Sequence, residues 1–98
     1  MHARVVTFEG GEPELVSRTI AQIGGETASG PPEGVPAVGL MILHNADDGK
    51  VLAITLFDTE DDMRQGDAAL NAMEPPNPGG MGRRVSVEMF NVGVKLDI

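Results

Sequence analysis

The sequence contains no cysteine, no tryptophan and no tyrosine, and it has only 3 phenylalanines among its 98 residues. Without cysteine, the chain can form neither a disulfide framework nor a reactive thiolate. The shortage of aromatic side chains leaves few of the residues that usually line ligand pockets. A chain of this length has room for one hydrophobic core, so we expect a single domain over residues 1–98.

Basic residues are also scarce, since 7 Lys and Arg stand against 15 Asp and Glu and leave a formal net charge of −8. Nucleic acids and anionic membrane surfaces bind clustered Lys and Arg. The only adjacent basic pair in this sequence is Arg83-Arg84. We therefore expect neither nucleic acid nor membrane as a partner, and the acidity favours solubility.

Long apolar runs are missing too, because no stretch approaches the roughly 20 residues that cross a bilayer. The first residues, Met1-His2-Ala3-Arg4, lead directly into a strand-like segment and do not resemble a signal peptide. Together with the lack of cysteine, this pattern predicts a cytoplasmic protein.

What the sequence does contain is an alternation of strand-like and helix-like segments. We expect strands at 3–9, 36–44, 50–57 and 83–98, and helices at about 13–23 and 59–73. Gly24-Gly25 predicts the end of the first helix, and residues 45–49 (NADDG) predict a tight turn between two antiparallel strands. The order βαββαβ predicts an α+β fold of the ferredoxin-like kind, with a four-stranded antiparallel sheet and two helices on one face.

Acidic residues crowd the expected start of the second helix, where Asp58, Glu60, Asp61 and Asp62 surround Thr59. Thr59 is a favourable N-cap, and the positive end of the helix dipole attracts negative charge. The alternative is a metal site, but helix capping explains the cluster better. We expect no metal and no cofactor. Residues 74–82 (EPPNPGGMG) predict a flexible loop that can serve as a lid.

Both faces of the second and third strands are apolar. On the third strand, one face carries Val51, Ala53, Thr55 and Phe57, and the other carries Leu52, Ile54 and Leu56. A sheet with one face in water alternates apolar and polar residues instead. Helices cover only one face, so we expect a homodimer in which two sheets pair face to face. The alternative is a monomer whose long loops fold over the sheet.

This pattern resembles the antibiotic biosynthesis monooxygenase-like domains of the dimeric α/β-barrel superfamily. The resemblance covers nearly the whole chain and rests on the element order, on residues 51–63 (VLAITLFDTEDDM) and on residues 83–94 (RRVSVEMFNVGV). It implies a homodimer whose two sheets form a barrel, with one cavity per subunit between sheet and helices. We expect Phe57, Met63, Leu70 and Met73 to line that cavity.

The resemblance also suggests activities, because relatives include oxygenases that need neither metal nor flavin, and haem-degrading enzymes. The haem-degrading relatives use an Asn on the first strand, a Trp on the third strand and a His on the second helix. Here the first strand has no Asn, the third strand ends in Phe57, and the second helix has no His. The quinone-forming oxygenases use polar aromatic residues, which this chain lacks.

Few side chains are suited to chemistry. His44, at the end of the second strand, is the candidate for proton transfer near neutral pH, and a surface role is its alternative. Asn91 on the last strand is the candidate for orienting a ligand carbonyl, unless a neighbouring backbone group or a partner chain satisfies its amide.

Further polar residues could serve a ligand. Thr7 and Thr55 could offer a hydroxyl group to a cavity. Arg64, Arg83 and Arg84 could bind an anion, with solvated charge or a surface ion pair as the alternative.

Two functions follow. The first is a cofactor-independent monooxygenase or isomerase that acts on a small apolar or aromatic substrate. The second is a non-catalytic module, either small-ligand-binding or accessory, that keeps the fold without the catalytic residues.

Overall fold

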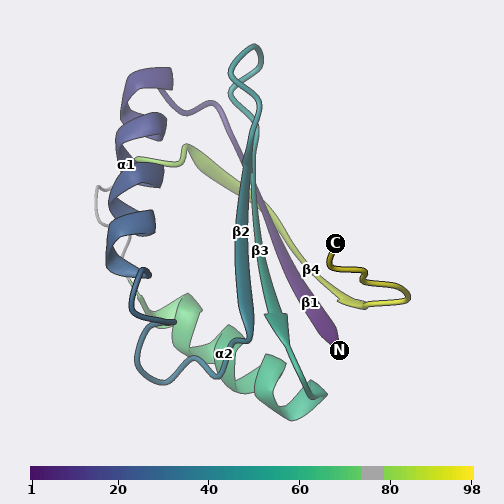
Figure 1. The fold of residues 1–98 in the computed structure, drawn as a ribbon. Helices are drawn as coiled ribbons and strands as arrows, with labels where there is room; N and C mark the ends of the chain where they lie inside the picture. The colour runs from purple at the N-terminus through teal and green to yellow at the C-terminus, as the bar shows by residue number, and fades with distance from the viewer. Residues whose placement is uncertain (74–78) are drawn as a thin grey trace.

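One antiparallel sheet with two helices on one side makes up the fold (Figure 1). The structure is a computed structural model and describes residues 1–73 and 79–98. Its elements are β1 (His2–Glu9), α1 (Pro13–Glu26), β2 (Gly39–His44), β3 (Val51–Phe57), α2 (Glu60–Ala72) and β4 (Arg83–Asn91). The 4 strands lie in the order β2-β3-β1-β4, which confirms the ferredoxin-like βαββαβ fold. The expected lid at 74–82 falls largely outside the described residues.

The strand register decides which side chains face the helices. In an antiparallel sheet, paired residues point to the same face, and neighbours along a strand alternate. Arg4 pairs with Thr55, and Val6 pairs with Ala53. These residues face α1 and α2, whereas Val5 and its partner Ile54 face the opposite side. We call the side away from the helices the open face.

The helix starts follow from local chemistry. The Thr59 hydroxyl accepts a hydrogen bond from the Asp62 backbone N–H at 3.0 Å, so Thr59 is the N-cap of α2. Glu60, Asp61 and Asp62 then occupy the first turn, where the helix dipole favours negative charge. Within residues 1–73 and 79–98, no group of three or more potential ligand side chains is arranged to hold a metal ion. The position of the acidic cluster in the first turn is the observation that favours helix stabilisation by these carboxylates.

Two element ends differ from the expectation. Gly24-Gly25 does not stop α1, because neither glycine adopts the left-handed conformation and the helix continues to Glu26. Thr27 ends it, with both its backbone N–H and its hydroxyl donating to the Ile23 carbonyl. The last strand ends at Asn91 and does not reach Ile98, since β1, its only neighbour, begins at His2. Similarly, β2 begins at Gly39 and not at Pro36.

The buried core is divided into two clusters. The first joins α1 to the sheet through Val16, Val51 and Met81, with Phe8, Ile20, Ile23 and Ile42 packed around them. The second joins α2 to the sheet through Val35, Phe57 and Met63, with Ala37, Ala69 and Leu70 around them. Space is left between the two clusters. Neither helix in the described part of the chain is long and apolar enough to cross a membrane.

Two glycine substitutions test the helix description. Gly24 lies inside α1 with open space where a Cβ would sit, so Gly24→Ala should raise the free energy of unfolding by about 0.5–1 kcal/mol. Gly66 of α2 is different, because an added Cβ would overlap the buried Phe57 ring. Gly66→Ala should lower the free energy of unfolding by about 1–3 kcal/mol. Urea denaturation measures both, and a destabilised Gly24→Ala protein would contradict a helix that runs through the glycines.

Candidate functional site

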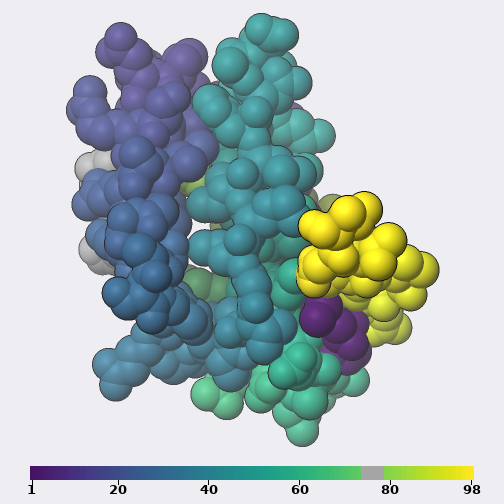
Figure 2. Space-filling model, in the orientation of Figure 1, coloured from purple at the N-terminus to yellow at the C-terminus, as the bar shows by residue number. Residues whose placement is uncertain are grey.

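A cavity of about 860 Å³ separates the helices from the helix-facing side of the sheet. The space-filling view shows a hollow between α1, at the left, and the teal strand segment beside it (Figure 2). Its wall combines residues of all four strands, both helices, the loop after α1 and the segment between α2 and β4: Arg4, Val6, Phe8, Ile23, Glu26, Thr27, Gly30, Pro31, Pro32, Val35, Ala37, Val38, Gly39, Leu40, Ile42, Ala53, Thr55, Leu70, Met73, Gly79, Gly80, Met81, Gly82 and Arg84.

The wall is mainly apolar, and the cavity lies in the space between the two core clusters. The volume is within the range of roughly 300–1,000 Å³ that is usual for sites that hold small molecules. Val38, Leu40 and Met73 remain 45–52% exposed although they lie against this space. Apolar side chains left uncovered in a concave wall favour an apolar occupant.

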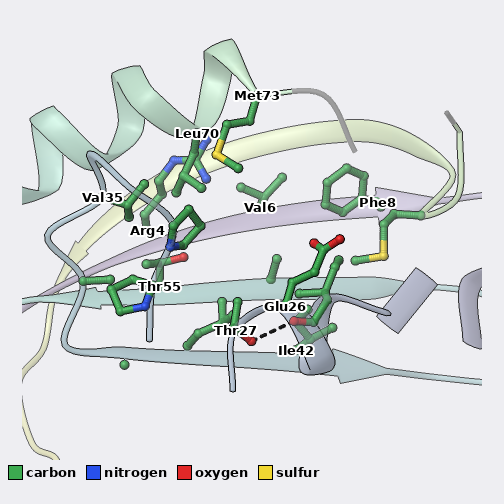
Figure 3. A pocket seen from close by; sticks show the side chains of 18 of the residues that line it. Arg4, Val6, Phe8, Glu26, Thr27, Val35, Ile42, Thr55, Leu70 and Met73 are labelled. Atoms are coloured by element: carbon green, nitrogen blue, oxygen red, sulfur yellow. Dashed lines mark hydrogen bonds between the residues drawn. The ribbon is translucent and has the colours of Figure 1, made fainter. Parts of the chain in front are cut away.

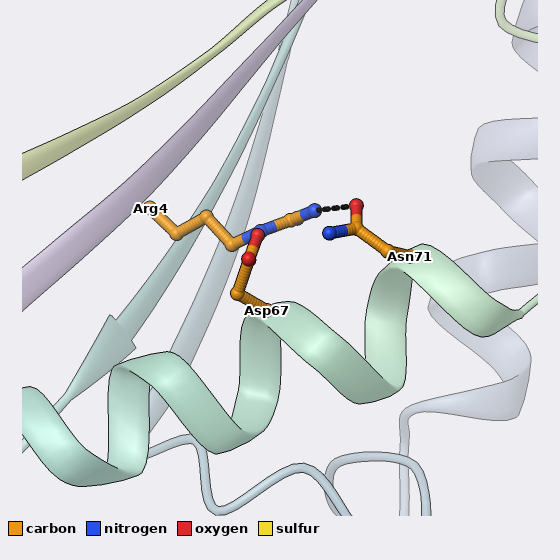
Figure 4. A network of polar contacts seen from close by, with 3 residues as sticks. All are labelled: Arg4, Asp67 and Asn71. Atoms are coloured by element: carbon orange, nitrogen blue, oxygen red, sulfur yellow. Dashed lines mark hydrogen bonds and ion pairs between the residues drawn. The ribbon is translucent and has the colours of Figure 1, made fainter.

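Arg4 is the buried charge of this wall. Its guanidinium projects from β1 towards α2, and its side chain is only 6% exposed (Figure 4). Nε donates to Asp67 Oδ1 at 2.8 Å, and Nη2 donates to Asn71 Oδ1 at 3.0 Å. Asp67 and Asn71 are separated by one turn of α2 and therefore lie on the same side of the helix. The two bonds tie α2 to the central strand beside the cavity.

Sequence reasoning overlooked Arg4, although the pattern that reveals it is visible. Arg4, Val6 and Phe8 alternate along the first strand, so the charge has to point into the protein together with the apolar side chains. A cation on the inner face of a strand is rare unless it is paired. The partners could not be identified from the sequence, because Asp67 lies 63 residues away.

The other polar groups of the wall occupy different depths. Thr55 is 6% exposed and lies next to Arg4 as its partner in the β1–β3 register. Figure 3 shows Arg4 and Thr55 towards one end of the cavity, with Glu26 and Phe8 towards the other. Glu26 and Arg84 are exposed, and so they belong to the rim. We call the end at Arg4 and Thr55 the inner end of the cavity. It therefore has one cation and one hydroxyl group.

The expected lining residues divide into two pairs. Leu70 lines the cavity from α2, and Met73 lines it from the C-cap of this helix. Phe57 and Met63 instead pack against Val35 in the second core cluster, beside the cavity wall. All four side chains face the space between helix and sheet, but the part near the start of α2 is filled.

His44 and Asn91 do not line the cavity. His44 borders a separate recess of about 260 Å³ beside the β2–β3 turn. Asn91 is exposed at the end of β4, where it pairs with His2. Catalytic roles for these two residues stay predictions.

The remaining candidates are also separated by the fold. Thr55 and Arg84 contribute to the cavity wall, whereas Thr7 pairs with Leu52 on the open face. Arg64 forms an exposed ion pair with Glu60 at 2.6 Å, one helical turn away. Among the described residues, the cavity wall thus holds no imidazole, thiol or phenol. Its polar side chains can form hydrogen bonds and ion pairs with a ligand.

The ion pair between Arg4 and Asp67 can be compared with the exposed pair between Arg64 and Glu60. Asp67→Asn leaves a buried guanidinium without its counter-charge and should lower the free energy of unfolding by about 1–3 kcal/mol. Glu60→Gln removes a carboxylate from a pair whose side chains are 71% and 57% exposed, and should cost about 0.5 kcal/mol or less. Equal losses in urea denaturation would show that Arg4 is not held as described.

Comparison with the models of known protein families gives no match, and comparison with curated proteins gives none either. Among solved structures, the fold is similar to that of a protein from Deinococcus radiodurans, described provisionally as an antibiotic biosynthesis monooxygenase. The two chains are 12% identical, the match covers 100% of this chain and 98% of the other, and the TM-score is 0.54. At that identity the likeness is one of fold. It confirms the resemblance to the antibiotic biosynthesis monooxygenase-like fold that the sequence predicts.

Proposed function

We propose that this protein binds a small, largely apolar molecule in the cavity between its helices and its sheet. The observation that carries the proposal is the cavity itself, about 860 Å³ in volume and walled mainly by apolar side chains. The side chains that border an unoccupied space lack dispersion contacts on that side, and a bound molecule would supply them. Arg4 and Thr55 supply the few polar groups that orient a ligand in such a site.

Cofactor-independent oxygenation is the second candidate, and the fold likeness to the Deinococcus radiodurans protein favours it. In that case the cavity excludes water and positions a substrate that supplies its own reactivity. The described wall offers Arg4 and Thr55 as groups that could stabilise a negatively charged oxygen. It offers no proton-transfer group of the histidine kind, and this favours binding without catalysis.

The binding proposal is tested with 1-naphthol, whose fluorescence can be followed directly because the chain has no Trp and no Tyr. The unaltered protein should bind it saturably. Ala53 is a small residue of the wall, so Ala53→Leu fills part of the cavity and should weaken binding at least about tenfold while the fold persists. Ala68→Leu, on the exposed side of α2, is the matched control and should bind like the unaltered protein.

Oxygen uptake with the same compound separates the two candidates. A binding module leaves the rate at the level of buffer alone. Uptake that depends on the protein and disappears in Ala53→Leu would support the oxygenase. If 1-naphthol binds neither the unaltered protein nor the Ala68→Leu protein, or binds the Ala53→Leu protein equally well, the cavity is not the site.

We also propose that the protein is a homodimer through the open face. Met41, Leu43 and Phe90 on this face are 44–48% exposed. Leu52, Ile54 and Leu56 lie half-buried between them. Full burial of each large apolar side chain stabilises a protein by roughly 1.5–3 kcal/mol. Packing against the same face of a second copy would therefore bury these side chains and stabilise both chains.

Two methionine substitutions test the dimer. Met41 lies on the open face opposite Ile54, and Met89 lies on the other face opposite Arg4. Their exposed fractions are similar, 48% and 43%. Met41→Lys should reduce the sedimenting mass at micromolar concentration from two chains to one, while Met89→Lys should remain dimeric. A monomeric unaltered protein, or dissociation by Met89→Lys alone, would rule out this interface.

A further inference from the structure

We propose that the cavity selects a small apolar carboxylate, whose carboxylate group binds the buried guanidinium of Arg4. This inference rests on the proposed function, since it names the class of ligand for the same cavity. It concerns the inner end of the site, where Arg4 and Thr55 lie side by side in the sheet.

The first argument is the number of donors on Arg4. A guanidinium has five N–H groups arranged as a planar fork. The bonds to Asp67 and Asn71 use Nε and one hydrogen of Nη2. Those two bonds do not involve Nη1. A ligand carboxylate can accept a charge-assisted hydrogen bond from Nη1.

The second argument is the free-energy cost of burying the positive charge of Arg4. The side chain of Arg4 is 6% exposed and that of Asp67 is 28% exposed, so water screens the carboxylate better than the guanidinium. Asn71 contributes a neutral oxygen. A buried cation with one partly solvated counter-ion gains from a further hydrogen-bonded negative charge nearby. Because Asp67 already supplies part of the balance, a monoanion suits the site better than a dianion such as a phosphate monoester.

The third argument is the distribution of polarity along the cavity. Thr55 lies beside Arg4, and its position allows the hydroxyl to serve the same anionic group. Away from this end the wall is mainly apolar through Val6 and Ile42, up to the exposed Glu26 and Arg84 at the rim. A ligand with one anionic end and an apolar body matches this order.

The test uses two ligands of the same shape, 2-naphthoate and 2-naphthamide. Binding is measured at pH 7, where the first is a monoanion and the second is neutral. The unaltered protein should bind the naphthoate roughly 10- to 100-fold more tightly, the range for one charged hydrogen-bonded contact. The ratio should persist in 0.5 M salt, because salt screens buried pairs much less than surface charges.

Arginine variants locate the selectivity. Arg4→Gln should bring the ratio of the two affinities to about one, and Arg64→Gln, which changes an exposed arginine outside the cavity, should leave it unchanged. Arg4→Lys keeps the charge without the fork and should lower the ratio only in part. It serves as the second variant if Arg4→Gln does not fold.

The outcomes separate the two proposals. If neither ligand binds, the proposed function fails. If both ligands bind equally well, the cavity binds apolar molecules but the carboxylate inference is wrong. Selectivity that vanishes in 0.5 M salt, or that remains in the folded Arg4→Gln or Arg4→Lys protein at its full value, would place the anion at the exposed Arg84 and overturn the role of Arg4.

Discussion

The division of the core into two separate clusters is the constraint on which the site depends. The side chains of α1 reach the sheet around Val16 and Val51, and those of α2 reach it around Phe57 and Met63. Between these contacts the middle of the sheet presents Val6, Ala53 and Ile42 to a space that the helices do not fill. A well-packed protein of this size would normally close such a space, because an empty apolar cavity costs free energy in proportion to its volume. A bound molecule of the proposed kind would restore contacts that the side chains around this space lack.

Arg4 links the sheet and α2 on the two sides of the same space. A charge on the inner face of the central strand cannot be buried alone, so it requires groups from across the gap. Asp67 and Asn71 meet that requirement from α2, and the pair of bonds fixes the position of this helix relative to β1. The cation thus connects α2 to the sheet and is also a polar group of the cavity wall.

The fold could be predicted from the sequence because each element carries its own local signal. The strand at β3, the N-cap at Thr59 and the turn at 45–49 all form as their residues predict. The errors arose where the outcome depends on something outside the segment. Gly24 and Gly25 can end a helix or continue it, and Thr27 decides between these outcomes. The last strand stops at Asn91 because β1 offers no further partner, which the sequence of residues 92–98 does not reveal.

The site was less predictable for the same physical reason. Periodicity correctly placed Phe57, Met63, Leu70 and Met73 towards the space between helix and sheet, but it could not show where that space is filled and where it is open. That boundary depends on Val35, which fills the region beside Phe57 from a loop with no regular pattern. Likewise, the two apolar faces of β2 and β3 have identical sequence signals and different surroundings. One is partly covered by helices and borders the cavity, and the other is left exposed at Met41 and Leu43. A sequence records that both faces avoid water, whereas only the three-dimensional arrangement distinguishes a wall that suits a ligand from a surface that suits a second copy of the chain.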